Sequence, residues 1–417
     1  MNPAEIWAVI IALSVTLYAV LDGFDLGVGM LLLIRKTGEE RTEMLNSIYP
    51  TWDGNETWIV LAGVGLYGGF PEAYGTLLPF LYVPFIVMLL SFIFRGVSLE
   101  FRFNAKGRMR KVWDTFFGVA SYLIVIAQGL ILGSMVHAAL HPGFFAAGNL
   151  SVFGFVSPTS VLMASIWVVV LMLHGLNWLT LKGNDELRHD MGVSARWLLI
   201  GLLLLVGFFI YAHLRLPAFA GPNGPYALNE VMSPGVWGAL GLGVCAALAS
   251  FLAHRASKPA WSFRAGLAMM VFFAIGVVMK LWPDIIPGDA SIYEVEARGA
   301  TDNILMVAAL IVIPVILAYI TYQYYVFRGP VKKGGYAFKR TKQEEEYLQK
   351  ARQSEARGDH STLPAKHVPA IAKWGVGVGF LALFLMMNGP LGEIYVLISM
   401  PLVMGLLMVV LYKSEPG

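Results

Sequence analysis

Long apolar runs alternate with short polar stretches along most of the chain. Each run can cross a hydrocarbon core of about 30 Å as an α-helix, which rises about 1.5 Å per residue. The pattern therefore predicts spanning helices rather than the buried helices of a soluble core. Nine segments are expected to form the body of the protein: Ile6–Leu33, Glu56–Phe70, Gly75–Phe94, Thr115–Ala138, Thr159–Leu181, Ala195–Leu214, Gly235–His254, Trp261–Pro283 and Asn303–Phe327.

The second of these segments is short and rich in glycine, with Gly63, Gly65, Gly68 and Gly69 inside it. Small residues let helices approach closely in a membrane, so we expect a close-packed span here. A re-entrant piece that enters and leaves on the same side is the alternative, because glycine also interrupts helices.

One strongly hydrophilic stretch divides the chain into three parts. Residues 1–328 are expected to form the transmembrane body, and residues 329–370 a cytoplasmic linker with a short surface helix and flexible flanks. Residues 371–417 are expected to form a C-terminal hairpin of two further spans, Ile371–Asn388 and Leu391–Tyr412. The hairpin has no functional explanation in the sequence.

Composition excludes a water-soluble globule, because 57% of the residues are hydrophobic and only 14% are charged, against about 25% charged in an average soluble domain. The single cysteine, Cys245, cannot build a disulfide framework or a thiolate metal site from this chain alone. The first apolar stretch, Ile6–Ile34, is too long for a signal peptide and lacks a small-residue cleavage site, so we expect the N-terminus to be retained.

Basic residues orient the predicted spans, because lysine and arginine resist translocation. Residues 139–158 carry no lysine or arginine, and residues 284–302 are mostly acidic. The loop after the third segment is strongly basic, with Arg102, Lys106, Arg108, Arg110 and Lys111. We therefore expect this loop and the linker to be cytoplasmic, and the N-terminus to lie outside if the second segment spans. The net charge of +3 follows from these loops and gives no support to nucleic-acid binding.

Two acidic residues, Asp22 and Asp25, lie within the apolar sequence of the first span. Their spacing of three residues puts them on one helix face. A carboxylate inside a bilayer costs several kcal/mol unless it is paired, hydrated or protonated, so such residues are functional candidates. The alternative is that both lie near the cytoplasmic boundary, where water or a neighbouring helix bonds them for packing alone.

A second acidic motif, residues 52–58 (WDGNETW), opens the second segment. Helix capping alone could explain Asp53 and Glu56. In the predicted topology, however, they enter from the same side as the aspartate pair, and Arg95 and Glu100 close the third span on that side. Convergent acids are what a proton-uptake path requires, because each site must hold and release a proton near neutral pH.

The histidines are poorly placed for binding a haem between helices, which needs two facing imidazoles at similar depth. Only His174 is well inside a predicted span, whereas His137, His213 and His254 lie at helix ends. We expect His174 to be a bonded packing residue that faces Asn177 or another helix. Motifs of the HExxH, CxxCH, GxGxxG and Walker types are also missing from the sequence. A redox cofactor is therefore expected in a partner chain.

Two motifs, DGFDLGVG and WDGNETW, resemble the N-terminal signature of subunit II of cytochrome bd-type quinol oxidases. The similarity spans about residues 1–330 and continues through three further stretches, 94–100, 174–178 and 314–329. The resemblance implies an all-α, polytopic membrane helical bundle whose nine-helix body consists of two four-helix bundles plus one helix. It also implies a location in the bacterial cytoplasmic membrane.

The resemblance further implies that a partner, subunit I, holds b-type haems with or without haem d, oxidises quinol at the outer face and reduces dioxygen to water. This chain would stabilise that subunit without ligating haem. A small single-span subunit is a further expected partner, and a quinone or lipid is expected in a groove of this chain. The family's cytoplasmic proton path corresponds here to Asp22, Asp25, Asp53, Arg95 and Glu100.

Reasoning from the residues adds Glu56 beside Asp53, near the point of proton uptake. Two rival functions stay open. A purely structural subunit would use the same aspartates to hold helices together. A proton-coupled secondary transporter would use them to bind the coupling ion, although the sequence shows no convincing internal repeat of the kind common in transporters.

Overall fold

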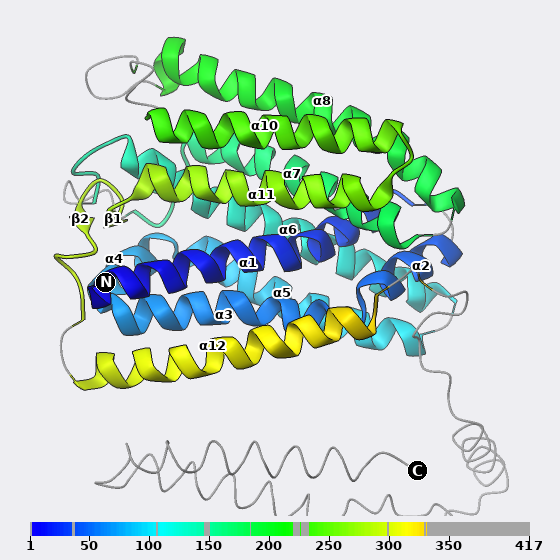
Figure 1. Ribbon diagram of the computed structural model, residues 1–417, viewed down its shortest axis with the longest axis horizontal. Coiled ribbons are helices and arrows are strands. Elements are labelled where there is room, and N and C mark those ends of the chain that lie inside the picture. The colour runs from blue at the N-terminus through cyan, green and yellow to red at the C-terminus, as the bar shows by residue number, and fades with distance from the viewer. Residues whose placement is uncertain are drawn as a thin grey trace, which may run out of the picture. The chain divides into compact units, whose positions relative to one another are not determined.

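Helices make up almost all of the structure, a computed structural model that describes residues 2–35, 38–105, 107–145, 151–183, 185–219, 226, 233–297, 300–328 and 331. Apart from Val331, the predicted linker and C-terminal hairpin lie outside these residues. Figure 1 shows the described helices as a bundle of roughly parallel and antiparallel rods. The helices are α1 (Pro3–Leu32), α2 (Gly38–Ile48), α3 (Trp52–Gly69), α4 (Pro71–Phe80), α5 (Tyr82–Asn104), α6 (Arg108–Ala139), α7 (Pro158–Lys182), α8 (Asp185–Arg215), α10 (Pro234–Arg255), α11 (Pro259–Leu281) and α12 (Ala300–Val326).

Eight helices in the described part of the chain are long and apolar enough to cross a membrane: α1, α5, α6, α7, α8, α10, α11 and α12. Each falls on one of the nine predicted segments. The remaining segment corresponds to α3, which has 18 residues but begins with the polar sequence WDGNET. The all-α membrane bundle is therefore confirmed, whereas the ninth span and the division into two four-helix bundles plus one helix stay predictions.

The third predicted segment, Gly75–Phe94, is wrong as a single continuous span. The chain breaks at Leu81, where α4 ends and α5 begins. Pro84 explains the break, because a continuous helix would need a hydrogen bond from residue 84 to the carbonyl of Phe80, and proline has no N–H to donate. Helix α5 then continues to Asn104, well past the predicted end.

Helix α2 was not predicted, because its sequence GEERTEMLNSI contains no long apolar run. Its last turns are nevertheless buried, from Met44 to Ile48. At the opposite end of the bundle, β1 (Asp284–Ile286) and β2 (Ala290–Ser291) form a small antiparallel hairpin after α11 (Figure 1). A short 3₁₀ turn, Pro217–Phe219, follows α8.

Helix α1 is the central element and packs against α3, α6 and α7. Its second half, from Asp22 to Leu32, is buried without interruption. Glycines allow the contact with α7, since a Cβ atom added to Gly27 would lie 2.8 Å from the Cα atom of Gly175. The glycine side of α1 therefore packs closely against α7. The opposite side of α1 contacts α3 and the side chain of Arg95 on α5.

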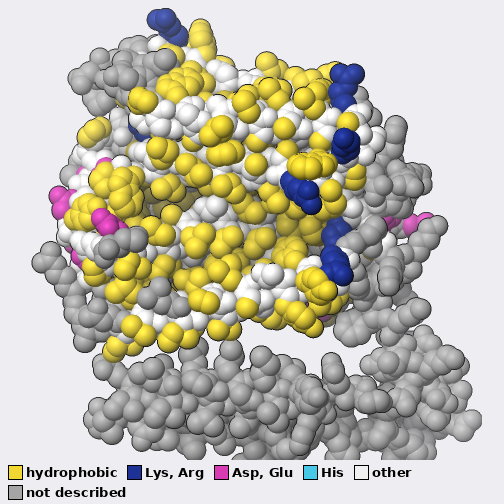
Figure 2. All heavy atoms as spheres, viewed as in Figure 1, with side chains coloured by type: hydrophobic (Ala, Val, Ile, Leu, Met, Phe, Trp, Pro, Cys, Tyr) yellow, Lys and Arg dark blue, Asp and Glu magenta, His cyan; other side chains and the backbone are white. Residues whose placement is uncertain are grey.

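The surface is divided into an apolar middle and charged ends. Figure 2 shows hydrophobic side chains over most of the visible face, with lysine and arginine gathered at the end where α10 joins α11. Exposed apolar residues include Val60 on α3, Leu90 on α5 and Ile311 on α12. Such a surface suits a bilayer or another membrane subunit rather than water.

Candidate functional site

A buried arginine joins three helices of the bundle. Arg95 on α5 is 0% exposed, and so is Asp22 on α1. The Nη2 atom of Arg95 donates to Oδ1 of Asp22 at 2.8 Å, and Nη1 donates to Oδ2 at 3.2 Å. Nη1 also donates to Oε1 of Glu56 on α3 at 2.6 Å. One guanidinium group therefore binds two carboxylates from two other helices.

Asp25 has a different environment from Asp22, although both are completely buried. Its Oδ2 atom accepts a hydrogen bond from Nδ2 of Asn55 at 2.7 Å. Its Oδ1 atom has no hydrogen-bond partner in the described part of the chain. Asn55 in turn accepts a hydrogen bond from the hydroxyl of Tyr324 on α12 at 3.0 Å. One carboxylate oxygen of Asp25 is thus without a hydrogen bond among the described residues, whereas both carboxylate oxygens of Asp22 accept hydrogen bonds from Arg95.

The sequence of α1 explains why both aspartates face the same way. A Cβ atom added to Gly23 would lie 3.0 Å from the side chain of Leu171, so this glycine faces α7. Asp22 and Asp25 lie on the opposite side of the helix, as their spacing requires. We call Asp22, Asp25, Glu56 and Arg95 the acid cluster.

Two of the six predicted site residues lie outside this cluster. Asp53 is exposed in the first turn of α3, one turn before Glu56. Glu100 is also exposed and accepts a hydrogen bond from the hydroxyl of Tyr49 at 3.4 Å. Partial burial and the neighbouring Glu100 carboxylate raise the pKa of Tyr49 above its usual value. Within the described residues, neither acid forms a hydrogen bond or ion pair with the acid cluster.

The capping interpretation of the second motif is wrong. Helix α3 begins at Trp52, so Thr51 rather than Asp53 is the N-cap residue, and no side-chain capping bond forms there. Glu56 binds Arg95 instead of a backbone N–H. Of the polar residues at the start of α3, Asn55 and Glu56 therefore bind the buried cluster, whereas Asp53 is exposed.

Sequence reasoning missed three neighbours of the cluster. Asn55 lies inside the WDGNETW motif, but a neutral amide between Asp53 and Glu56 gives no charge signal of its own. Tyr18 precedes Asp22 by one helical turn and hydrogen-bonds its carboxylate. Tyr324 lies about 270 residues away from Asn55 in the chain, and no local pattern connects the two.

His174 is buried, and its Nε2 atom donates to the backbone carbonyl of Val20 at 2.8 Å. The imidazole also stacks on Phe263, with ring centroids 5.7 Å apart. The Nε2 atom is therefore occupied by a backbone hydrogen bond, whereas Nδ1 has no hydrogen-bond partner in the described part of the chain. No cluster of three His, Cys, Asp or Glu side chains in the described ranges is arranged to hold a metal ion.

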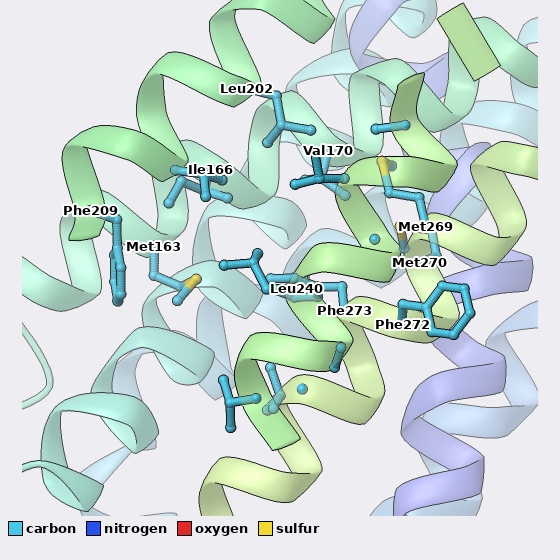
Figure 3. A pocket seen from close by; sticks show the side chains of 18 of the residues that line it. Met163, Ile166, Val170, Leu202, Phe209, Leu240, Met269, Met270, Phe272 and Phe273 are labelled. Atoms are coloured by element: carbon cyan, nitrogen blue, oxygen red, sulfur yellow. The ribbon is translucent and has the colours of Figure 1, made fainter. Parts of the chain in front are cut away.

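An apolar cavity of about 150 Å³ lies away from the acid cluster, among α7, α8, α10 and α11. Figure 3 shows Met163, Ile166, Leu202, Phe209 and Leu240 around it. Its lining is apolar except for Lys280, which comes from the last turn of α11. Such a lining suits a hydrocarbon chain and has no group for redox or proton chemistry at its centre.

The fold and the buried charges define a multi-pass membrane protein that holds ionisable groups inside its helices. The profile of the family described as cytochrome bd terminal oxidase subunit II matches residues 3–327. This chain therefore belongs to that family.

Individual relatives agree with this assignment. The chain is 25% identical over 361 residues to cytochrome bd-I ubiquinol oxidase subunit 2 of Escherichia coli strain K12, covering 79% of this chain and 95% of the relative. It is 27% identical over 343 residues to cytochrome bd ubiquinol oxidase subunit 2 of Bacillus subtilis strain 168, covering 78% and 96%. A solved structure of bd oxidase from Geobacillus thermodenitrificans shares the fold, with a TM-score of 0.59, 18% identity, and coverage of 78% of this chain and 99% of that chain.

Membership of the family establishes the coarse function. The chain is a subunit of a respiratory-chain oxidoreductase and a multi-pass protein of the bacterial cytoplasmic membrane. Because the family is the second subunit of the oxidase, the complex also contains a first subunit. Cytochrome bd oxidases are haem-dependent complexes.

Proposed function

We propose that this chain conducts protons from the cytoplasm towards the oxygen-reducing centre of a bd-type quinol oxidase and stabilises the subunit that holds the haems. The observation that carries the proposal is the acid cluster, in which three carboxyl groups and one guanidinium are brought together inside a membrane helix bundle. Groups of this kind persist in a membrane interior where they serve a function.

The order of exposure gives the proposed route a direction. Asp53 is exposed, the side chain of Glu56 is 20% exposed, and Asp22 and Asp25 are completely buried. A proton taken up near Asp53 would pass to Glu56 and then to the aspartates. Glu100, exposed beside Tyr49 on the same side, belongs to the uptake surface rather than to the route itself.

Within this route the two aspartates have different tasks. Arg95 binds both oxygens of Asp22 and one of Glu56, so it fixes the charge balance of the cluster. Asp25 has one oxygen without a hydrogen bond in the described part of the chain. A carboxyl group can take up a proton on an oxygen that accepts no hydrogen bond from a neighbouring cation. Asp25 has such an oxygen, and Asp22 does not. We therefore assign the transferable proton to Asp25.

The exposed part of Glu56 indicates where the partner lies. Glu56 is on α3, and Val60 and Val64, four and eight residues further along the same helix face, are 62% and 51% exposed. A carboxyl group that opens towards lipid is costly, whereas one that opens towards a protein neighbour can be hydrogen-bonded. We infer that subunit I, carrying the b-type haems with or without haem d, covers this face and receives the proton.

The remaining expectations complete the proposal. Basic loops on the inner side and the N-terminus outside would place proton uptake in the cytoplasm. Quinol oxidation at the outer face would then generate a membrane potential without a pump. The apolar cavity is the place that we assign to a quinone tail or a lipid chain. A small single-span subunit, the 329–370 linker and the 371–417 hairpin remain parts of the proposed complex.

Asp25→Asn combined with Asp53→Asn, made in the assembled oxidase, tests the route. We expect normal haem content, at least tenfold slower oxygen consumption and a reduced membrane potential, because asparagine cannot carry the proton. The control is Glu72→Gln, which removes an exposed carboxyl group at the start of α4.

Unchanged oxygen consumption with normal haem content would eliminate the route. Loss of haem or of assembly in the double variant, with no separate transfer defect, would favour the purely structural subunit. Purification without any haem-containing chain would instead favour the transporter.

A further inference from the structure

A second charged cluster lies where the end of α5 meets α2 and the start of α6. Arg102 is 1% exposed, and its Nε atom donates to Oδ1 of Asp114 at 2.7 Å. Its Nη2 atom donates to the hydroxyl of Thr42 at 3.1 Å. We call these residues, together with Arg41 and Arg110, the arginine cluster.

Positive charge is in excess here. Arg110 donates to the same Thr42 hydroxyl at 3.2 Å, and Nη1 of Arg41 lies 3.5 Å from Oδ2 of Asp114. The charges that act on Arg102 are those of Asp114, Arg110 and Arg41. Arg102 and Arg41 thus share one carboxylate, and Arg110 adds a third guanidinium group that contacts Thr42 rather than Asp114. These three arginines and Asp114 together carry a net charge of +2. Repulsion between like charges is strong where water is scarce, so an anion here would be stabilising.

Hydrogen-bond donors in the same place are open. Nη1 of Arg102 and Nε of Arg110 are buried and have no hydrogen-bond partner in the described part of the chain. Arg110 belongs to the first turn of α6, whose N-cap residue, Gly107, offers no side-chain cap. The first N–H groups of a helix point outwards along its axis and favour an anion. The start of α6 therefore offers backbone donors in the helix to which Arg110 belongs, and Arg102 on α5 contacts the same Thr42 hydroxyl as Arg110.

We propose that the arginine cluster binds a phosphate group. Guanidinium forks match the oxygens of phosphate. The single negative charge of a phospholipid phosphodiester would offset part of the excess of positive charge, and free phosphate, with up to two negative charges, could offset all of it. The phosphate belongs to an anionic phospholipid of the adjacent leaflet or to free phosphate in solution. Basic pockets between membrane helices commonly bind such headgroups. This site is separate from the acid cluster and does not rest on the proposed proton route.

The test uses the purified oxidase complex in detergent and the temperature at which it unfolds. Phosphatidylglycerol is added in increasing amounts, and phosphatidylcholine, a zwitterionic lipid without net charge, is the lipid comparison. Sodium phosphate against sodium chloride of equal ionic strength is the soluble comparison. We expect the unfolding temperature to rise with one of the two phosphate sources. In Arg110→Gln we expect the concentration that gives half of this rise to increase about fivefold, the effect of losing one basic contact.

Arg108→Gln is the matched control, because Arg108 is in the same helical turn, carries the same charge and is exposed. A response to phosphatidylglycerol that weakens in Arg110→Gln and persists in Arg108→Gln supports the site with a lipid as its ligand. The same contrast with sodium phosphate supports it with free phosphate. Equal weakening in both variants would show diffuse surface attraction and overturn the proposal, as would a wild-type complex that responds to neither.

Discussion

The two buried arginines of α5 lie seven residues apart, on one face of the helix, in opposite electrostatic settings. Arg95 is outnumbered by carboxyl groups, those of Asp22, Asp25 and Glu56. Arg102 belongs to a group in which guanidinium groups outnumber the carboxylate of Asp114. The same residue type therefore lies in two opposite charge environments. In the functions that we propose, the excess of carboxyl groups in the first cluster holds a proton, and the excess of positive charge in the second binds an anion.

The largest effect is expected from Arg95→Gln. This variant removes the one cation of the acid cluster and leaves buried carboxylates without a partner, a change that costs about 3–5 kcal/mol when a buried ion pair loses one member. We expect the complex to fail to assemble, measured as the haem content and yield after purification. Arg95→Lys keeps the charge and should retain part of the yield. A stable, haem-loaded Arg95→Gln complex would show that the cluster does not need its cation.

A smaller effect is expected from Asp114→Asn in the arginine cluster. The carboxylate is 4% exposed and binds both Arg102 and Arg41, so its loss should cost about 2 kcal/mol, in the range for hydrogen bonds to charged groups. We expect a lower unfolding temperature with little change in the rate of oxygen consumption by the folded complex. An Asp114→Asn complex as stable as the wild type would remove the contrast between the two clusters.

Much of the helical fold could be predicted because a bilayer imposes a minimum length of apolar sequence. The aspartates of α1 were also predictable, since charge inside an apolar run stands out in the sequence alone. The break at Leu81 was not predicted, because Pro84 lies in an apolar run that is long enough to span a membrane. Helix α2 was not predicted, because its 11 residues are too few and too polar for a span.

The composition of the site was less predictable than its location. Asp53 and Glu56 lie in one motif and three residues apart on one helix face. Glu56 nevertheless reaches Arg95 whereas Asp53 stays exposed, because Asp53 is in the first turn of α3, one turn nearer the end of the helix. The role of Asn55 depends on Tyr324 from α12, a contact that only the packed structure creates. Distant contacts of this kind leave no periodic signal along the chain.

The smallest effect is expected from Tyr324→Phe. The hydroxyl of Tyr324 donates to Oδ1 of Asn55, whose Nδ2 atom binds Asp25. Its removal deletes one buried hydrogen bond, worth about 1 kcal/mol, and frees the amide of Asn55 to turn away from the carboxylate. If Asn55 positions Asp25 for proton transfer, oxygen consumption should fall by about two- to fivefold with haem content unchanged. Tyr325→Phe is the control, because that side chain is on the next position of α12 and is 61% exposed. Equal rates in the two variants would mean that the contact of Asn55 with α12 holds the helices together without tuning Asp25.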